Sequence, residues 1–193
     1  MIESIKSIIE NLPDVDLVDA RIPEAIKNNN AINLNFICTH NARRSHLSQV
    51  WAQVMASYYG FDEVTCFSGG TEVTQMHPNV AKTLGRQGFN IEVVQEGDNP
   101  KYTLQYDEEL EPILAFSKLY NDAFNENPFA AILVCSAAEE ACPFIEEATH
   151  RILLPFDDPK YSDDTPQEAE VYEAKSLEIA AQMKAIFKAA LEN

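Results

Sequence analysis

Apolar side chains recur along this 193-residue chain at two spacings, one typical of helices and one typical of strands. A spacing of three or four residues predicts helices near 2–12, 45–59, 78–87 and 167–191, with a short helical piece near 23–27. Alternating or continuous apolar runs predict strands near 32–37, 63–67, 129–135 and 151–154. Strands that alternate with helices favour a parallel sheet with right-handed crossovers.

The order of these elements predicts an α/β fold, a single three-layer domain whose four-stranded parallel sheet is flanked by helices. This domain spans 32–193 and follows an N-terminal helical extension at 1–31. Residues 95–128 form an insertion in the domain, where Tyr102–Gln105 and Ile113–Leu119 could add strands or a hairpin. A stretch of about 34 residues rarely holds a hydrophobic core, so we do not expect a second domain.

The charge balance is strongly acidic, with 14 Lys and Arg against 31 Asp and Glu and a net charge of −17. Nucleic-acid binding needs clustered basic residues, so we expect no nucleic-acid partner. A small anionic substrate would need a local positive site, because the overall field repels anions.

No segment of the sequence predicts membrane insertion or export. The longest apolar run, near 129–135, is far shorter than a bilayer span, and residues 1–6 lack the apolar core of a signal peptide. We therefore expect a cytoplasmic protein with no membrane partner.

Four cysteines, Cys38, Cys66, Cys135 and Cys142, are too sparse for a disulfide framework in a chain of this length. They form no C-x2-C pair and no His/Cys cluster with zinc-ligand spacing, so we expect no structural metal site. The thiols are then either packed in the interior or reactive. For Cys66, inside a predicted strand, we favour packing.

The segment between the first strand and the next helix, Cys38-Thr39-His40-Asn41-Ala42-Arg43-Arg44-Ser45, has the pattern C-x5-R-S. Successive backbone N–H groups and a helix N-terminus can surround a tetrahedral anion, and an arginine can clamp two of its oxygens. We expect this oxyanion site to be formed by Thr39, His40, Asn41, Ala42, Arg43 and Arg44. The same positive field favours the thiolate form of Cys38, the candidate nucleophile, and Ser45 can donate a hydrogen bond to it. The alternative is a buried cysteine beside a solvent-exposed arginine.

Two further segments follow predicted strands. Phe156-Asp157-Asp158-Pro159 could bring a carboxylic acid to the anion site, or could be an ordinary turn. Cys135 and Cys142 follow the strand at 129–135, so Cys135 is expected at the same sheet edge as Cys38. This pair could form a disulfide only if the segment between them rearranges, since an intact helix would hold the two sulfurs too far apart.

These motifs together resemble the low-molecular-weight tyrosine phosphatase superfamily over about 32–190, and within it the thioredoxin-coupled arsenate reductases. The resemblance also includes Ser68-Gly69-Gly70-Thr71 and His77-Pro78. The C-x5-R-S and Asp-Pro elements are shared with phosphatases, whereas the cysteine pair points to the reductases. Arg43, where a small residue is more usual, departs from the pattern, as do the long insertion and the first 30 residues.

The resemblance implies a phosphatase I-like fold and a mechanism for arsenate reduction. Cys38 would attack arsenate as a thiolate while Arg44 and the loop amides hold its oxygens, and Asp158 would protonate the departing oxygen. Cys135 would then attack the adduct, arsenite would leave, and Cys142 would complete a Cys135–Cys142 disulfide that thioredoxin reduces. These steps need no metal or organic cofactor.

Two other functions remain open. A phosphatase acting on phosphotyrosine or a small phosphoester would need only Cys38, Arg44 and Asp158, with Tyr161 as a possible aromatic wall for the substrate. A noncatalytic anion-binding or regulatory module is the third alternative, and the complete set of reacting groups argues against it.

Overall fold

A four-stranded parallel sheet forms the centre of the computed structural model, which describes residues 1–28, 32–141 and 144–192. Its strand order is β2-β1-β6-β7. The strands are β1 (Ile32–Cys38), β2 (Val64–Gly70), β6 (Phe129–Leu133) and β7 (Ala148–Leu153). The predicted α/β fold is therefore confirmed.

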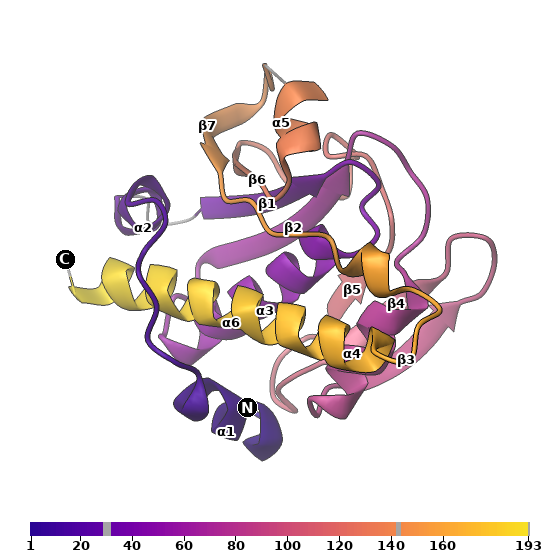
Figure 1. Ribbon diagram of the computed structural model, residues 1–193. Coiled ribbons are helices and arrows are strands. Elements are labelled where there is room, and N and C mark those ends of the chain that lie inside the picture. The colour runs from indigo at the N-terminus through magenta and orange to yellow at the C-terminus, as the bar shows by residue number, and fades with distance from the viewer. Residues whose placement is uncertain (29–31, 142–143, 193) are drawn as a thin grey trace.

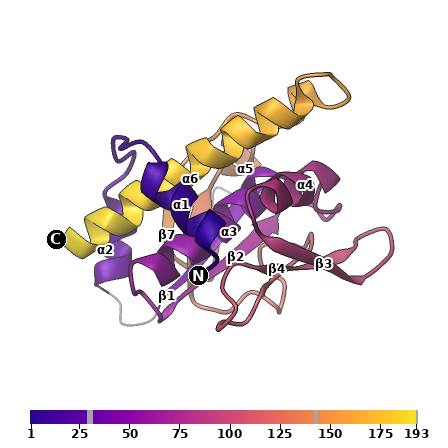
Figure 2. The same cartoon turned by 90° about the horizontal axis from the view of Figure 1, so that it is seen from below.

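Helices cover the sheet on both sides (Figure 1). On one side α3 (Arg44–Tyr58) packs against α6 (Glu168–Glu192), and the short α5 (Ser136–Ala141) lies on the other. Three more helices contact or flank α6, as Figure 2 shows from below: α1 (Glu3–Asn11), α2 (Arg21–Lys27) and α4 (Pro78–Arg86). The bounds of α1, α2, α3, α4 and α6 agree to within two residues with the helices predicted from apolar spacing, whereas α5 was not predicted from it.

The N-terminal extension shares the core of the main domain. Ile5 and Ile9 of α1 are fully buried, and Ile22 of α2 is only 1% exposed. Lys184 of α6 donates hydrogen bonds from Nζ to the carbonyls of Ile9 and Leu12, at 2.9 and 3.0 Å. The extension therefore covers the outer side of α6 and does not form a separate unit.

A second, three-stranded antiparallel sheet precedes β6, in the order β3-β4-β5. It comprises β3 (Asn90–Gln95), β4 (Lys101–Gln105) and β5 (Ile113–Ala115). Strands in the insertion were expected, but β3 was missed and β5 ends four residues earlier than Ile113–Leu119. The sequence of β3 does offer the β-branched apolar residues Ile91, Val93 and Val94, although nearly every side chain of the strand is exposed.

The irregular second half of the insertion, residues 116–128, covers the sheet face opposite α3. Asn33 Nδ2 donates to the Pro128 carbonyl at 3.1 Å, and Asn35 Nδ2 to the Tyr120 carbonyl at 2.8 Å. On the same face the Phe67 and Phe124 rings meet edge to face, with centroids 6.2 Å apart. The insertion thus supplies part of the third layer of the domain.

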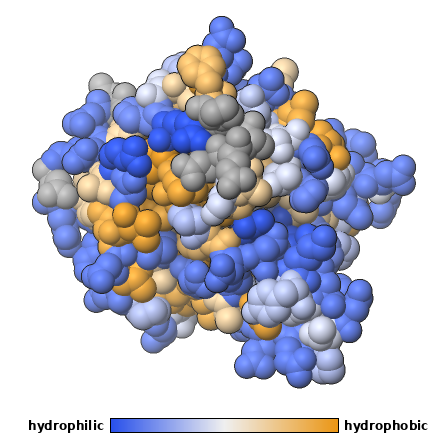
Figure 3. Space-filling view, turned by 45° about the horizontal axis from the view of Figure 1, so that its top comes forward, coloured by the Kyte–Doolittle hydropathy of each residue, from blue (hydrophilic) through white to orange (hydrophobic). Residues whose placement is uncertain are grey.

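The surface in Figure 3 is mostly hydrophilic, with small apolar patches between polar groups. This agrees with the acidic composition of the chain. Within the residues that the structure describes, no helix combines the length and apolarity needed to cross a bilayer.

Candidate active site

The predicted site residues gather at the carboxyl ends of two neighbouring strands. β1 ends at Cys38, and Cys135 lies two residues beyond the end of β6. The two strands pair in parallel up to Ile37 and Leu133, and the Val134 amide donates to the Ile37 carbonyl at 2.8 Å. Parallel pairing therefore brings segments almost 100 residues apart to one edge of the sheet.

The backbone carbonyls of the loop after Cys38 point outward. Three of them accept hydrogen bonds from backbone amides: the Cys38 carbonyl from Thr71 N (3.3 Å), the Thr39 carbonyl from Glu72 N (2.9 Å) and the Ala42 carbonyl from His77 N (2.9 Å). The His40 carbonyl accepts from two hydroxyl groups, Thr74 Oγ1 (2.8 Å) and Ser117 Oγ (3.1 Å). In a trans peptide unit the C=O and the next N–H point in opposite directions. Outward carbonyls therefore turn the loop amides inward, toward a common hollow that suits an anion.

Asn41 holds this loop in shape. Its backbone has a positive φ of 44°, a conformation that asparagine tolerates better than most residues. The Lys118 amide donates to Asn41 Oδ1 at 2.8 Å, and Asn41 Nδ2 donates to Ser45 Oγ at 2.9 Å. The Ser45 hydroxyl hydrogen is then available for Cys38 Sγ, 3.1 Å away. This chain of hydrogen bonds ends at the Cys38 sulfur and fixes its position at the base of the loop.

Gly70 allows the loop to lie against β2. A Cβ at this position would come within 2.8 Å of the Thr39 carbonyl oxygen and 2.9 Å of the Asn41 nitrogen. Both are backbone atoms, so a larger side chain would push the loop out of place. The Ser68-Gly69-Gly70-Thr71 motif therefore has a steric basis in the loop geometry.

The side chain of Arg44 reaches the segment after β7. Its Nη1 donates to the Phe156 carbonyl at 3.0 Å, and its Nη2 forms an ion pair with Asp158 Oδ2 at 2.6 Å. The third donor, Nε, is buried and has no hydrogen-bond partner among the described residues. Arg44 thus contacts the candidate acid and keeps one N–H group from which an oxyanion could accept a hydrogen bond.

Arg43 points in another direction, toward α6. Its Nε donates to the Tyr172 hydroxyl at 2.6 Å, and its Nη2 pairs with Asp163. Burial, followed by the hydrogen bond to Asp163, raises the pKa of Tyr172, so this hydroxyl remains a neutral donor. Only the backbone of Arg43 is left to face the hollow of the loop.

Cys135 lies between the loop and α5 and is 2% exposed. The Ala138 amide donates to its Sγ at 3.3 Å, and Thr39 Oγ1 lies 3.8 Å from the same sulfur. Cys135 is a free thiol, as are Cys38 and Cys66. The predicted partner Cys142 lies outside the described residues.

A cavity of about 480 Å³ brings Arg44, Cys135 and Asp158 together, but Cys38 and residues 39–43 are not part of its lining. Its lining includes Arg44, Cys135 and Asp158, together with Ser136, Ala137, Pro155, Phe156, Asp157 and Glu178. A guanidinium, a thiol and a carboxylate therefore face one space. Tyr161 is 74% exposed and does not line this cavity.

Two residues beside the loop had no signal in the sequence. Lys118 is 2% exposed, and its ammonium group lies over the rings of Phe116 and Phe124, at 4.6 and 5.3 Å from their centroids. Burial lowers its pKa to about 8. His46 is fully buried, and its Nδ1 lies 3.2 Å from Ser68 Oγ. Neither residue belongs to a motif: Lys118 reaches the loop through the fold, whereas His46 directly follows Ser45 in the sequence.

The described part of the chain holds no group of three or more His, Cys, Asp or Glu side chains arranged to bind a metal ion.

Comparison with known proteins gives distant relatives. No protein-family model matches the chain. The arsenate reductase of Shouchella clausii is 27% identical over 150 residues, which cover 77% of this chain and 90% of the relative. The arsenate reductase of Bacillus licheniformis is 26% identical over 133 residues, 69% of this chain and 78% of the relative. A low molecular weight protein tyrosine phosphatase from T. tengcongensis has a TM-score of 0.57 at 11% identity, covering 82% of this chain and 99% of that structure.

The chain thus has the fold of the low-molecular-weight tyrosine phosphatases. Within that fold, the relatives detected by sequence are named arsenate reductases. The resemblance indicated by the motifs is confirmed at this level.

Proposed function

We propose that this protein is an arsenate reductase that uses Cys38 as nucleophile and Cys135 as the second thiol. The observation that carries the proposal is that Cys135 lines the same cavity as Arg44 and Asp158. Hydrolysis of a phosphoester needs a nucleophile, an anion clamp and an acid, but no second thiol. A second thiol in that cavity suits a reaction that consumes two electrons. The distant arsenate reductase relatives support this substrate.

The first step is binding of the oxyanion in the loop. Its oxygens accept hydrogen bonds from the inward amides of residues 39–43 and from Arg44, whose Nε has no other partner among the described residues. An anion at Arg44 competes with Asp158, because both are acceptors for the same guanidinium. Asp158 is then released toward the leaving oxygen.

Covalent attack follows. The Cys38 thiolate forms a sulfur–arsenic bond, and one arsenate oxygen leaves as water after accepting a proton from Asp158, which takes that proton from solvent once its ion pair with Arg44 is broken. Ser45 donates its hydroxyl hydrogen to the sulfur before attack and holds it toward the loop. Arsenic remains in its +5 state in this adduct.

Reduction requires the second thiol. Cys135, as a thiolate, attacks the Cys38 sulfur, and a Cys38–Cys135 disulfide forms while the sulfur–arsenic electron pair leaves with arsenite. The two thiols thus supply the two electrons. The Ala138 amide, 3.3 Å from Cys135 Sγ, stabilises the attacking thiolate.

Turnover requires a reductant. In our proposal Cys142 attacks Cys135, the Cys135–Cys142 disulfide forms, and thioredoxin reduces it. Because α5 spans Ser136–Ala141, closing this disulfide requires the helix to unwind, which would expose the bond to a partner. Such a cycle suits a reducing compartment such as the cytoplasm.

The decisive experiment compares two reactions in one set of variants. Arsenate reduction is followed with thioredoxin and thioredoxin reductase, and phosphoester hydrolysis with p-nitrophenyl phosphate. Cys135→Ser and Cys142→Ser should each stop multiple-turnover reduction and leave any hydrolysis largely intact. Cys66→Ser, which removes a buried thiol outside this cavity, is the matched control and should retain reduction. Sustained reduction by both of the first two variants would overturn the proposal.

A phosphatase is the second candidate. The loop geometry, Arg44 and Asp158 suffice for hydrolysis through a phosphocysteine, and the fold is that of low-molecular-weight phosphatases. If wild-type protein hydrolyses phosphoesters but never forms a Cys135–Cys142 disulfide with arsenate, this candidate replaces the reductase. Peptide mapping after one equivalent of arsenate gives the answer.

A further inference from the structure

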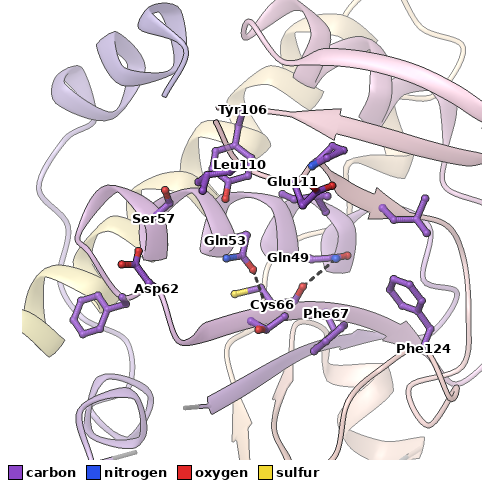
Figure 4. Close-up of a pocket in the computed structure, with 15 residues that line it drawn as sticks. Gln49, Gln53, Ser57, Asp62, Cys66, Phe67, Tyr106, Leu110, Glu111 and Phe124 are labelled. Atoms are coloured by element: carbon purple, nitrogen blue, oxygen red, sulfur yellow. Dashed lines mark hydrogen bonds between the residues drawn. The ribbon is translucent and has the colours of Figure 1, made fainter. Parts of the chain in front are cut away.

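A second cavity, also of about 480 Å³, lies beside β2, one of the two edge strands of the central sheet (Figure 4). It shares no lining residue with the cavity at Arg44 and Cys135. One wall comes from α3, β2 and the turn between them, and the other from the insertion, through Tyr106, the segment 110–114 and Phe124. The insertion therefore creates this cavity by closing over the sheet edge.

The edge of β2 in this cavity is occupied by two glutamines of α3. Gln53 accepts from the Cys66 amide at 2.8 Å and donates to the Val64 carbonyl at 3.2 Å. Gln49 Nε2 donates to the Cys66 carbonyl at 3.1 Å. These side-chain amides take the place of a neighbouring strand, so the edge is not free to pair with an extended peptide.

The other end of the Gln49 amide is unpaired. Gln49 is 2% exposed, and its Oε1 is buried without a hydrogen-bond partner among the described residues. Figure 4 shows this oxygen on the side of the amide away from Cys66, toward the Phe124 end of the cavity. A buried acceptor without a donor is unfavourable, and an N–H or O–H group of a ligand would satisfy it.

The other residues that line the cavity indicate the shape, polarity and charge of such a ligand. Phe61, Phe67, Tyr106 and Phe124 provide aromatic surfaces suited to a flat apolar group. The charged lining residues, Asp62 and Glu111, are both acidic and exposed, and no lining residue is basic. An anion would be repelled, whereas a neutral or cationic molecule would not.

We propose that this cavity binds a small aromatic molecule that has an N–H or O–H donor and no negative charge. Its ring packs between the aromatic walls, and its donor binds Gln49 Oε1. Aromatic amines and nitrogen heterocycles of about the size of indole have this chemistry. The volume of the cavity lies in the range of ordinary small-molecule sites.

Matched probes test the donor and the charge. The full-length protein, labelled with ¹⁵N, is titrated with indole and with benzofuran, which has the same shape but no N–H. Tryptamine and indole-3-acetate form a second pair that differs in charge. We expect saturable shifts of the Gln49 side-chain amide with indole, about tenfold weaker binding of benzofuran, and weaker binding of indole-3-acetate than of tryptamine.

One variant with a matched control tests the location of the site, and a further variant tests the acceptor. Thr65 is exposed and lines the cavity, so Thr65→Trp should fill the cavity and abolish indole binding without disturbing the core. Glu63→Trp, at a neighbouring exposed position outside the lining, is the control and should bind indole like wild type. Gln49→Met removes the acceptor and should bind indole and benzofuran equally, with its fold checked by thermal melting.

Several results would overturn the proposal. Equal affinity of the wild-type protein for indole and benzofuran would remove Gln49 from recognition. Undiminished indole binding by Thr65→Trp would place the site elsewhere. Absence of saturable binding by every probe would show that the cavity is not a small-molecule site. Binding of a tryptophan-containing peptide, with none of the free probes, would assign the cavity to a protein partner instead.

Discussion

The two cavities have the same volume, about 480 Å³, and opposite chemistry. At the carboxyl end of the sheet, Arg44, Asp158 and Cys135 bring two charges and a thiol into one space. Beside β2, aromatic rings surround an uncharged amide, and the acidic groups lie at exposed positions. In our proposals the first space binds and transforms an anion, whereas the second binds a neutral or cationic aromatic molecule with a hydrogen-bond donor.

The difference follows from where each cavity lies on the sheet. Strand ends of a parallel sheet lead into loops, and loops present backbone amides and polar side chains in a fixed frame. A sheet edge instead leaves unpaired backbone groups that must be covered. Here Gln49 and Gln53 provide that cover, and the insertion closes the space above them.

The largest expected effect is a loss of catalysis that leaves ligand binding in the cavity beside β2 unchanged. Cys38→Ser should lower both arsenate reduction and phosphoester hydrolysis by at least about 10³-fold, because the serine hydroxyl is a far weaker nucleophile than a thiolate. Indole binding beside β2 should stay at the wild-type level, since Cys38 does not line that cavity. Steady-state assays and the NMR titration measure the two sites independently. Either activity persisting near the wild-type rate would remove Cys38 from the mechanism.

Next comes a pair of arginines that are adjacent in sequence and differ in their contacts. Arg44→Lys should lower kcat/KM about 10²-fold, because lysine cannot reproduce the two-point guanidinium contact. Arg43→Lys should change kcat/KM less than about threefold and mainly lower the melting temperature, because its side chain binds Tyr172 and Asp163. Kinetics and thermal melting on both proteins test this. A greater kinetic loss in the Arg43 variant would contradict the proposed loop.

A smaller effect is expected for the candidate acid. Asp158→Asn should slow turnover of phenyl phosphate about tenfold or more and that of p-nitrophenyl phosphate less, since the better leaving group needs less protonation. Asp157→Asn is the control: this neighbouring residue is exposed, whereas Asp158 contacts Arg44. Equal effects of the two changes, or no dependence on the leaving group, would leave Asp158 without this role.

The sequence predicted the first cavity better than the second for a physical reason. The C-x5-R-S loop is contiguous, so its backbone and Arg44 are placed by local geometry and one strand-to-helix turn. The contact of Asn41 with Lys118 joins residues 77 positions apart, and that of Arg43 with Tyr172 joins residues 129 apart. Such contacts depend on the packing of distant elements and have no local pattern.

The cavity beside β2 shows the same limit. In the sequence, Gln49 and Gln53 look like ordinary polar residues of a helix. Only the position of β2 beside α3 lets them form hydrogen bonds with the backbone of that strand. The sheet of the insertion was only partly predicted: strands at β4 and β5 were expected, whereas β3 was missed although it contains Ile91, Val93 and Val94, and most of its side chains are exposed. Long-range assembly, and not composition, determines these features.

The smallest expected effect is on stability and concerns His46, which lies behind the loop. It is fully buried on α3, its Nε2 has no partner among the described residues, and burial, followed by the nearby Lys118 charge, lowers its pKa to about 3. An unfolded histidine has a pKa near 6.5, so between about pH 6.5 and 3 the unfolded chain binds a proton that the folded protein does not. This difference stabilises the unfolded state progressively as the pH falls through that range.

His46→Gln should therefore reduce the loss of stability between pH 7 and pH 5, by at most about 1.4 kcal/mol per pH unit below pH 6.5. Glutamine can still bond Ser68 but does not titrate, so the variant separates charge from packing. Urea denaturation at the two pH values measures the change, and His150→Gln, at an exposed position, is the control. An equal acid-induced loss in wild type and His46→Gln would mean that the folded protein accepts the proton on His46 and that the loop tolerates a charge behind it.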